Sequence, residues 1–171
     1  MTEVVLATRN PGKVREIRAI LEAVPGLSPV GLDALGIPET AEEDGLETAP
    51  TFAENALAKA RYFAARTGRI VLADDSGLAV DALDGAPGVH SRRFAGADRL
   101  RGRGQDEANI QLLLERLDAV PDAGRTARFV CVMAVVAPDG REATFEGAVE
   151  GTILRAPRAA GLSLPGSLSA S

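Results

Sequence analysis

Short apolar runs alternate with helical periodicity along this chain, and that order limits the folds open to it. Residues 4–7 form an apolar, β-branched run that ends at a turn rich in Asn, Pro and Gly. From Gly12 onward, apolar residues recur on one helical face until Pro25 and Gly26 end the pattern. Further apolar runs follow at 69–73 and 128–136. Strands and helices in this order predict a mixed α/β domain, and 171 residues suffice for one core.

A second helix is predicted after an acidic segment. Residues 36–50 are rich in carboxylates and broken by Pro and Gly, which predicts a long exposed loop. Thr51 and Glu54 then form a capping box, and Gly68 ends the helix that they open. Glu54 is therefore interpreted as structural rather than catalytic.

The remaining elements complete the α/β pattern. Asp106 is predicted to cap a helix that runs through Leu117. Residues 138–140, Pro-Asp-Gly, form a turn that leads from the strand at 128–136 into another at 142–149.

Composition excludes several classes of function. A formal net charge of −5 and an aromatic content of 4% with no Trp argue against a nucleic-acid partner. No apolar run approaches membrane-spanning length, and the first residues lack a signal-peptide pattern, so a cytoplasmic protein with no membrane partner is expected. The single cysteine, Cys131, lies within an apolar run and is interpreted as a core residue.

Two adjacent carboxylates, Asp74 and Asp75, follow the apolar run at 69–73. Like charges on neighbouring residues are unfavourable unless a cation, hydrogen-bond donors or a raised pKa relieves the repulsion. The pair is thus a candidate for metal binding or acid–base chemistry. An equally good interpretation is a strand-ending turn in which one Asp caps backbone amides.

The segment from Thr8 to Lys13 joins the first strand to a helix N-terminus, where backbone amides and the helix dipole favour an anion such as phosphate. It lacks the Walker A pattern and the G-x-G-x-x-G pattern. Lys13 could instead be a solvated first-turn charge, but a cation there opposes the dipole unless an anion lies between them. Together the two segments suggest a polyphosphate site with Mg²⁺ held by Asp75 and a carboxylate of the acidic segment, either Glu42 or Glu43.

At this point the chain resembles a known family, the Ham1-like, non-canonical purine nucleoside triphosphate pyrophosphatases. Four motifs stand in the family's order and approximate spacing: residues 7–13 (ATRNPGK), 51–56 (TFAENA), 73–78 (ADDSGL) and 85–91 (GAPGVHS). The resemblance covers roughly residues 3–158. It implies an elongated mixed sheet with flanking helices, two lobes around a central cleft, and usually a homodimer.

The resemblance also implies Mg²⁺-dependent hydrolysis of ITP, dITP and XTP to the nucleoside monophosphate and pyrophosphate. Asp75 would be the proton acceptor and a metal ligand, with Glu43 preferred over Glu42 as the second ligand because it precedes a turn as the family's acidic residue does. The implied substrate-binding residues are Thr8, Arg9, Asn10, Pro11, Gly12, Lys13 and Ser76.

The family pattern stops near residue 158. A Gly-Phe-Gly-Tyr-Asp segment, a later Lys and a Ser-His-Arg segment, which read the purine in the family, have no counterpart in residues 159–171. We therefore expect a single pyrophosphatase domain over 1–158, lacking its C-terminal part, and a divergent, disordered tail over 159–171.

Loss of the base-reading segments leaves alternatives to the leading function. The first is a catalytically impaired nucleotide-binding protein that keeps only the phosphate and metal half of the site. Another is a related pyrophosphatase with a different base preference. An aspartyl-phosphate phosphatase is disfavoured because residues 74–77 lack a second Asp two positions after the nucleophile.

Overall fold

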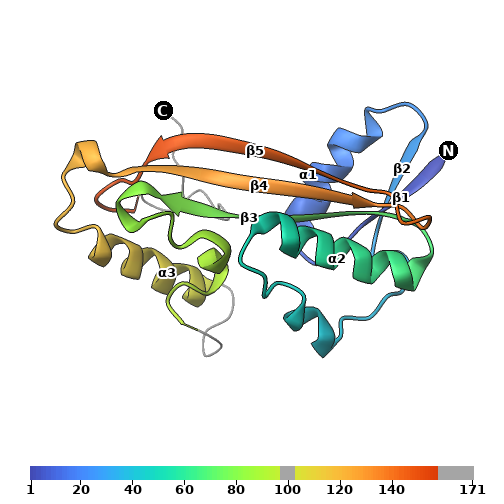
Figure 1. Ribbon diagram of the computed structural model, residues 1–171, viewed down its shortest axis with the longest axis horizontal. Helices are drawn as coiled ribbons and strands as arrows, with labels where there is room; N and C mark the ends of the chain where they lie inside the picture. The colour runs from blue at the N-terminus through green and yellow to red at the C-terminus, as the bar shows by residue number, and fades with distance from the viewer. Residues whose placement is uncertain (97–102, 158–171) are drawn as a thin grey trace. The chain divides into compact units, whose positions relative to one another are not determined.

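The strands form one five-stranded sheet with the order β2-β1-β3-β4-β5, and helices flank it (Figure 1). The computed structural model describes residues 1–96 and 103–157. β1 runs parallel to both of its neighbours, β2 and β3. The main elements are β1 (Thr2–Leu6), α1 (Pro11–Glu22), β2 (Leu27–Gly31), η1 (Ala41–Gly45), α2 (Phe52–Thr67), β3 (Ile70–Val80), η2 (Asp81–Leu83), η3 (Gly88–Arg93), α3 (Arg103–Arg116), η4 (Asp122–Gly124), β4 (Thr126–Val136) and β5 (Glu142–Thr152). The predicted mixed α/β class is confirmed.

Contacts along the chain divide it into two units. The first comprises Met1–Asp75 and Val132–Glu146, and the second comprises Ser76–Cys131 and the chain from Gly147 onward. Their number agrees with the two lobes that the family resemblance implies. A single domain over 1–158 stays a prediction, and the predicted tail at 159–171 lies outside the described residues.

A short parallel ladder forms the centre of the first unit. Val4 lies opposite Ile70 and Leu6 lies opposite Leu72, so the ladder between β1 and β3 ends at Leu6 and Leu72. One side of this ladder is covered by α1, whose apolar stripe follows the predicted helical period. The packed residues are Val4, Leu6, Leu72, Val14, Ile17 and Leu21.

β2 is an element that the sequence analysis did not predict. Its five residues, Leu27–Gly31, include Pro29, which removes one backbone donor. The strand lies at the edge of the sheet, where a missing donor is tolerated. A strand containing proline has no clear signature in sequence, and this explains the omission.

The capping signals predicted α2 correctly. The Thr51 hydroxyl accepts from the backbone N–H of Glu54 at 3.2 Å and donates to the Glu54 carboxylate at 2.8 Å. Gly68 ends the helix with φ +62°, a left-handed conformation that favours glycine.

The prediction of a strand that ends at residue 73 is wrong, because β3 continues to Val80. Asp74 and Asp75 lie within the strand, only 3% and 9% exposed, so the strand-ending turn is also wrong. Asp disfavours strands by propensity, but specific partners of each carboxylate override that preference here.

The second unit has its own apolar core, made of Leu78, Val80, Leu113, Leu117, Ala127 and Ile153. Its helix α3 begins at Arg103, three residues before the predicted cap. Asp106 lies in the first turn instead, where its negative charge still faces the positive end of the helix dipole.

The predicted hairpin between β4 and β5 is confirmed. The N–H of Ala137 donates to the carbonyl of Arg141 at 2.8 Å, and Gly140 adopts φ +86° in the turn. Across the described ranges 1–96 and 103–157, none of the helices is long and apolar enough to cross a membrane.

Candidate active site

Both predicted segments of the site follow the same edge of the parallel ladder. The N–H of Ala7 donates to the carbonyl of Leu72 at 2.8 Å, and this is where the β1–β3 pairing ends. Residues 8–13 leave β1 at that point, and Asp74 and Asp75 follow in β3. Sites in α/β proteins lie at the carboxyl ends of parallel strands, which is where these polar residues gather.

Lys13 and Asp74 form an ion pair in which the Lys13 Nζ lies 2.5 Å from Asp74 Oδ2. The Asp74 side chain is 3% exposed, whereas the Lys13 side chain, in the first turn of α1, is 25% exposed. Lys13 therefore reaches the strand within one residue of Asp75, since consecutive Cα atoms lie about 3.8 Å apart. Of the three ways to relieve the carboxylate repulsion that the sequence left open, Asp74 has a cation, Lys13.

Asp75 is held from the other helix of the unit. The Asn55 Nδ2 of α2 donates to Asp75 Oδ2 at 2.9 Å in a buried contact. Adjacent residues of a strand point to opposite faces, which explains why Asp74 meets α1 while Asp75 meets α2. The two carboxylates are therefore separated by the strand and each is stabilised by a different partner.

Asp74 also carries an oxygen suited to a cation. Its Oδ1 is buried and has no hydrogen-bond partner among the described residues. A buried acceptor in this state is unfavourable unless a ligand, an ion or a water reaches it. Carboxylate oxygens are the donors that Mg²⁺ prefers, so the chemistry of Asp74 Oδ1 fits a divalent cation on the face of the strand that Asp74 occupies.

Glu43, the predicted second metal ligand, has a different partner. Arg9 Nε donates to Glu43 Oε2 at 3.1 Å, and Arg9 Nη2 donates to Oε1 at 2.7 Å. Within the described part of the chain, no group of three His, Cys, Asp or Glu side chains is placed to hold a metal, so Glu43 does not join the two aspartates in one cluster. Its role as a ligand stays a prediction.

The Arg9–Glu43 pair shifts both pKa values. The hydrogen bond to Glu43 raises the pKa of Arg9 above its usual value. Burial alone would raise the pKa of Glu43, but hydrogen bonds from Arg9 and from the Thr40 N–H outweigh it and lower that pKa. Both groups are therefore charged at neutral pH.

We expect Glu43→Gln to lower the melting temperature at pH 7 by roughly 2–5 °C, because the ion pair is lost. A carboxylate with a lowered pKa contributes stability above its unfolded value of 4.5, and this contribution disappears as the pH falls through the folded value. The two melting temperatures should therefore converge below pH 4.5. Thermal unfolding from pH 7 to pH 3 measures this, and a constant difference would contradict it.

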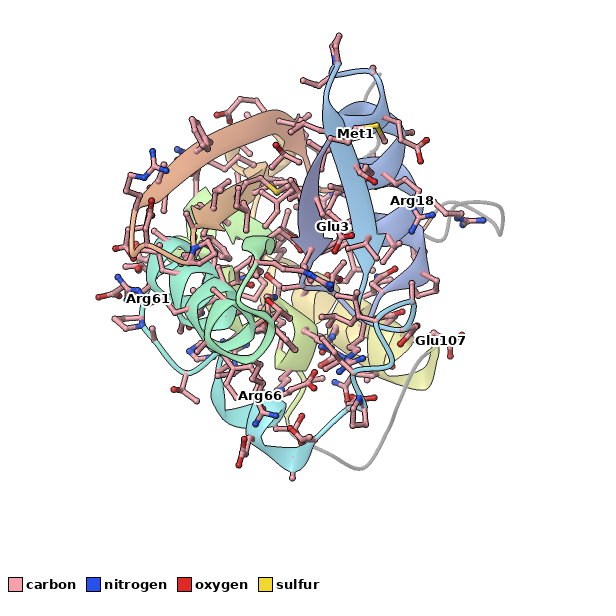
Figure 2. The ribbon with its side chains drawn as sticks, turned by 90° about the vertical axis from the view of Figure 1, so that its right-hand side faces the viewer. Met1, Glu3, Arg18, Arg61, Arg66 and Glu107 are labelled. Carbon is pink, nitrogen blue, oxygen red and sulfur yellow. The ribbon has the colours of Figure 1, made fainter. Side chains whose placement is uncertain are left out.

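Glu42, the alternative metal ligand, lies against α2. The Tyr62 hydroxyl donates to Glu42 Oε2 at 3.0 Å, and Arg66 Nη2 donates to the same oxygen at 2.5 Å. Figure 2 shows Arg66 projecting from α2. The segment predicted as an exposed loop over 36–50 therefore contains a short helix, η1, in which Glu42 and Glu43 are paired with arginines.

Side chains of the turn between β1 and α1 accept from three of its backbone amides, those of Asn10, Gly12 and Lys13. Asn10 is the N-cap, and its Oδ1 accepts from the N–H groups of Gly12 at 2.8 Å and Lys13 at 3.3 Å. The Asn10 N–H donates to the Thr8 hydroxyl at 3.2 Å, and Pro11 has no N–H. A phosphate can bind these amides only where the Asn10 side chain moves aside, a condition that the sequence did not reveal.

Ser76 follows Asp75 in β3 and is half-buried. It is the first residue of the second unit, so its predicted contact with substrate stays a prediction.

Asn55 was not among the predicted site residues, although it lies in one of the family-like motifs. It is fully buried in α2. A signal was present in the sequence, because Asn is neutral to unfavourable inside helices and needs a local reason there.

A mixed α/β fold with charged side chains at the carboxyl edge of a parallel ladder defines a class of protein that binds small polar ligands at that edge. Comparison with known proteins specifies the member of that class. The chain belongs to the Ham1 family, whose model matches residues 4–162.

Similar proteins agree with this assignment. A dITP/XTP pyrophosphatase from Geobacter sulfurreducens is 49% identical over 161 residues, covering 94% of this chain and 76% of the relative. Another from Symbiobacterium thermophilum is 50% identical over 157 residues, covering 92% and 73%. The crystal structure of a nucleoside-triphosphatase / dITP/XTP pyrophosphatase from Mycobacterium abscessus aligns with a TM-score of 0.74 at 43% identity, covering 92% of this chain and 77% of that one.

Proposed function

We propose that this protein hydrolyses non-canonical purine nucleoside triphosphates, namely ITP, dITP and XTP, to the nucleoside monophosphate and pyrophosphate. This reaction removes deaminated purines from the nucleotide pool. The observation that supports it best is the cluster of Lys13, Asp74, Asp75 and Asn55 at the carboxyl edge of the parallel ladder. Membership of the Ham1 family supports it independently.

Asp75 is proposed as the proton acceptor. It takes a proton from water as the water oxygen bonds to the α-phosphorus. The bond from that phosphorus to the bridging oxygen of the β-phosphate breaks, and pyrophosphate departs with the electron pair. Lys13 offsets the charge that develops on the departing group.

Mg²⁺ is the proposed cofactor, held by Asp75 and Glu43, and when bound it would neutralise charge on the phosphates. Lys13 and the turn at residues 8–12 are proposed to contact the phosphates, with Ser76 adding a hydroxyl. The Arg9 guanidinium donates five hydrogen bonds, two to Glu43 and one each to Asp33 and to the carbonyls of Ile37 and Pro38. For Arg9 to contact a phosphate, it must release at least one of these five.

The test is to incubate the protein with Mg²⁺ and, in separate reactions, with ITP, dITP, XTP or ATP, and to identify the inorganic product. Pyrophosphate released faster from the non-canonical purines than from ATP supports the proposal. Equal rates indicate the related pyrophosphatase with another base preference, and nucleotide binding without turnover indicates the impaired form. Orthophosphate as the product rejects attack at the α-phosphorus. A homodimer located in the cytoplasm stays a prediction, and light scattering tests the dimer.

A further inference from the structure

Asn55 is a polar side chain at a buried position of α2, a position where an apolar residue is more common. It is the fourth residue of α2, and it is 0% exposed. The other buried residues of this helix are all apolar: Ala56, Ala60, Phe63 and Ala64. Burying an amide without partners is unfavourable, so the bonds that it makes explain its presence.

Both ends of the Asn55 amide are bonded. Its Oδ1 accepts from the Ala49 N–H at 2.8 Å, and its Nδ2 donates to Asp75 Oδ2 at 2.9 Å. The Ala49 N–H can only donate, and an ionised carboxylate can only accept. The two partners therefore fix which end of the amide faces Asp75, and a flipped amide would lose both bonds.

The amide connects the acidic segment to the strand. Ala49 lies at the end of the segment that precedes α2, and a second anchor of that segment is the ion pair between Glu47 and Lys59, with the Lys59 Nζ 2.5 Å from Glu47 Oε1. Lys59 lies four residues after Asn55 in α2, and its ammonium donates to Glu47. The Glu47–Lys59 ion pair therefore holds only the acidic segment, whereas Asn55 holds both that segment and the Asp75 carboxylate.

We propose that Asn55 is a positioning residue that holds the Asp75 carboxylate in its reactive orientation and ties it to residues 46–50. This inference rests on the proposed function, since it assigns Asn55 a role through Asp75. A hydrogen bond to one carboxylate oxygen fixes the rotation of the group, and thus the direction of its second oxygen. Partners that orient a reactive group typically contribute about 10–100-fold in activity.

Two substitutions distinguish the two ends of the amide. Asn55→Asp keeps the size of the side chain and an acceptor for Ala49, but it places an acceptor where Asp75 needs a donor. Asn55→Leu keeps the approximate volume and removes both bonds. We expect both variants to lower kcat for ITP by about 10–100-fold while KM changes by less than about threefold. Wild-type kcat in Asn55→Asp would overturn the proposal, because Ala49 would then be the partner that matters.

The matched control is Glu47→Gln, which weakens the other anchor of the same segment without touching Asp75. Its kcat should change by less than about threefold. An effect on kcat as large as that of Asn55→Asp would overturn the proposal in favour of a general need for an ordered segment.

A double-mutant cycle with Asp75→Asn measures the coupling between the two residues in the single-turnover rate. A merely structural role of Asn55 would not produce this coupling. If Asn55 acts through Asp75, adding Asn55→Leu to Asp75→Asn lowers the single-turnover rate by less than about threefold. A further loss equal to that of the single Asn55 variant would overturn the inference.

Melting temperatures of the same four proteins test the contact between Asn55 and Asp75 without any turnover. Contacting residues give non-additive shifts, whereas independent residues give shifts that sum. A wild-type protein that releases no pyrophosphate rejects the proposed function, and the melting-temperature cycle then decides the Asn55 contact by itself. Additive shifts would overturn it.

Discussion

Asp75→Asn should release pyrophosphate from ITP at least about a hundredfold more slowly than the wild-type protein. The substitution keeps the size of the side chain but removes the group that accepts the proton and one charge that would bind a divalent cation. Asp75 is 9% exposed, so bulk water cannot readily replace it as a base. Steady-state assays of pyrophosphate release with Mg²⁺ measure the effect.

The control for this variant is a second aspartate that lies outside the site. Asp81 follows β3, is about half exposed, and accepts hydrogen bonds from Thr126 and Arg128. Asp81→Asn should keep nearly all activity. Circular dichroism and thermal unfolding establish that Asp75→Asn remains folded, and a folded Asp75→Asn with wild-type turnover would remove Asp75 from the mechanism.

The sequence predicted the elements whose signals are local. The first helix was predicted from its apolar period after Gly12 and its end at Pro25 and Gly26, and the second helix from its capping box and Gly68. These signals act over a few residues, so neighbouring chemistry decides them. The adjacent aspartates were also identified correctly as a pair that needs external stabilisation, which Lys13 and Asn55 provide.

The partners themselves could not be predicted because they are distant in sequence. Lys13 and Asp74 are 61 positions apart, and Arg9 and Glu43 are 34 apart. A motif shows which residue types are present, but it does not show that the Arg9 guanidinium donates hydrogen bonds to the Glu43 carboxylate. The Asn10 cap likewise competes with the phosphate site that the same residues suggest.

The same limit applies to Arg125, which no local pattern marks and which is 2% exposed at the start of β4. Its guanidinium donates to three backbone carbonyls: Nε to Ile153 at 3.0 Å, Nη1 to Leu117 at 2.5 Å and Nη2 to Leu154 at 3.2 Å. Leu117 follows the last turn of α3, where the negative end of the helix dipole favours a cation. Arg125 thus joins the end of α3 to the segment that follows β5.

Arg125→Met should therefore destabilise the protein by about 3–5 kcal/mol, because methionine fills the apolar part of the space but removes the guanidinium donor from all three carbonyls, two of them in buried contacts. Urea unfolding measures the free energy. Arg128→Met in the same strand is the matched control, since Arg128 is 46% exposed and its ion pairs with Asp81 and Glu150 are weakened by solvent. That control should cost less than about 1 kcal/mol. Equal effects of the two substitutions would show that Arg125 contributes no more than an exposed arginine, and the second unit would then depend on its apolar core alone.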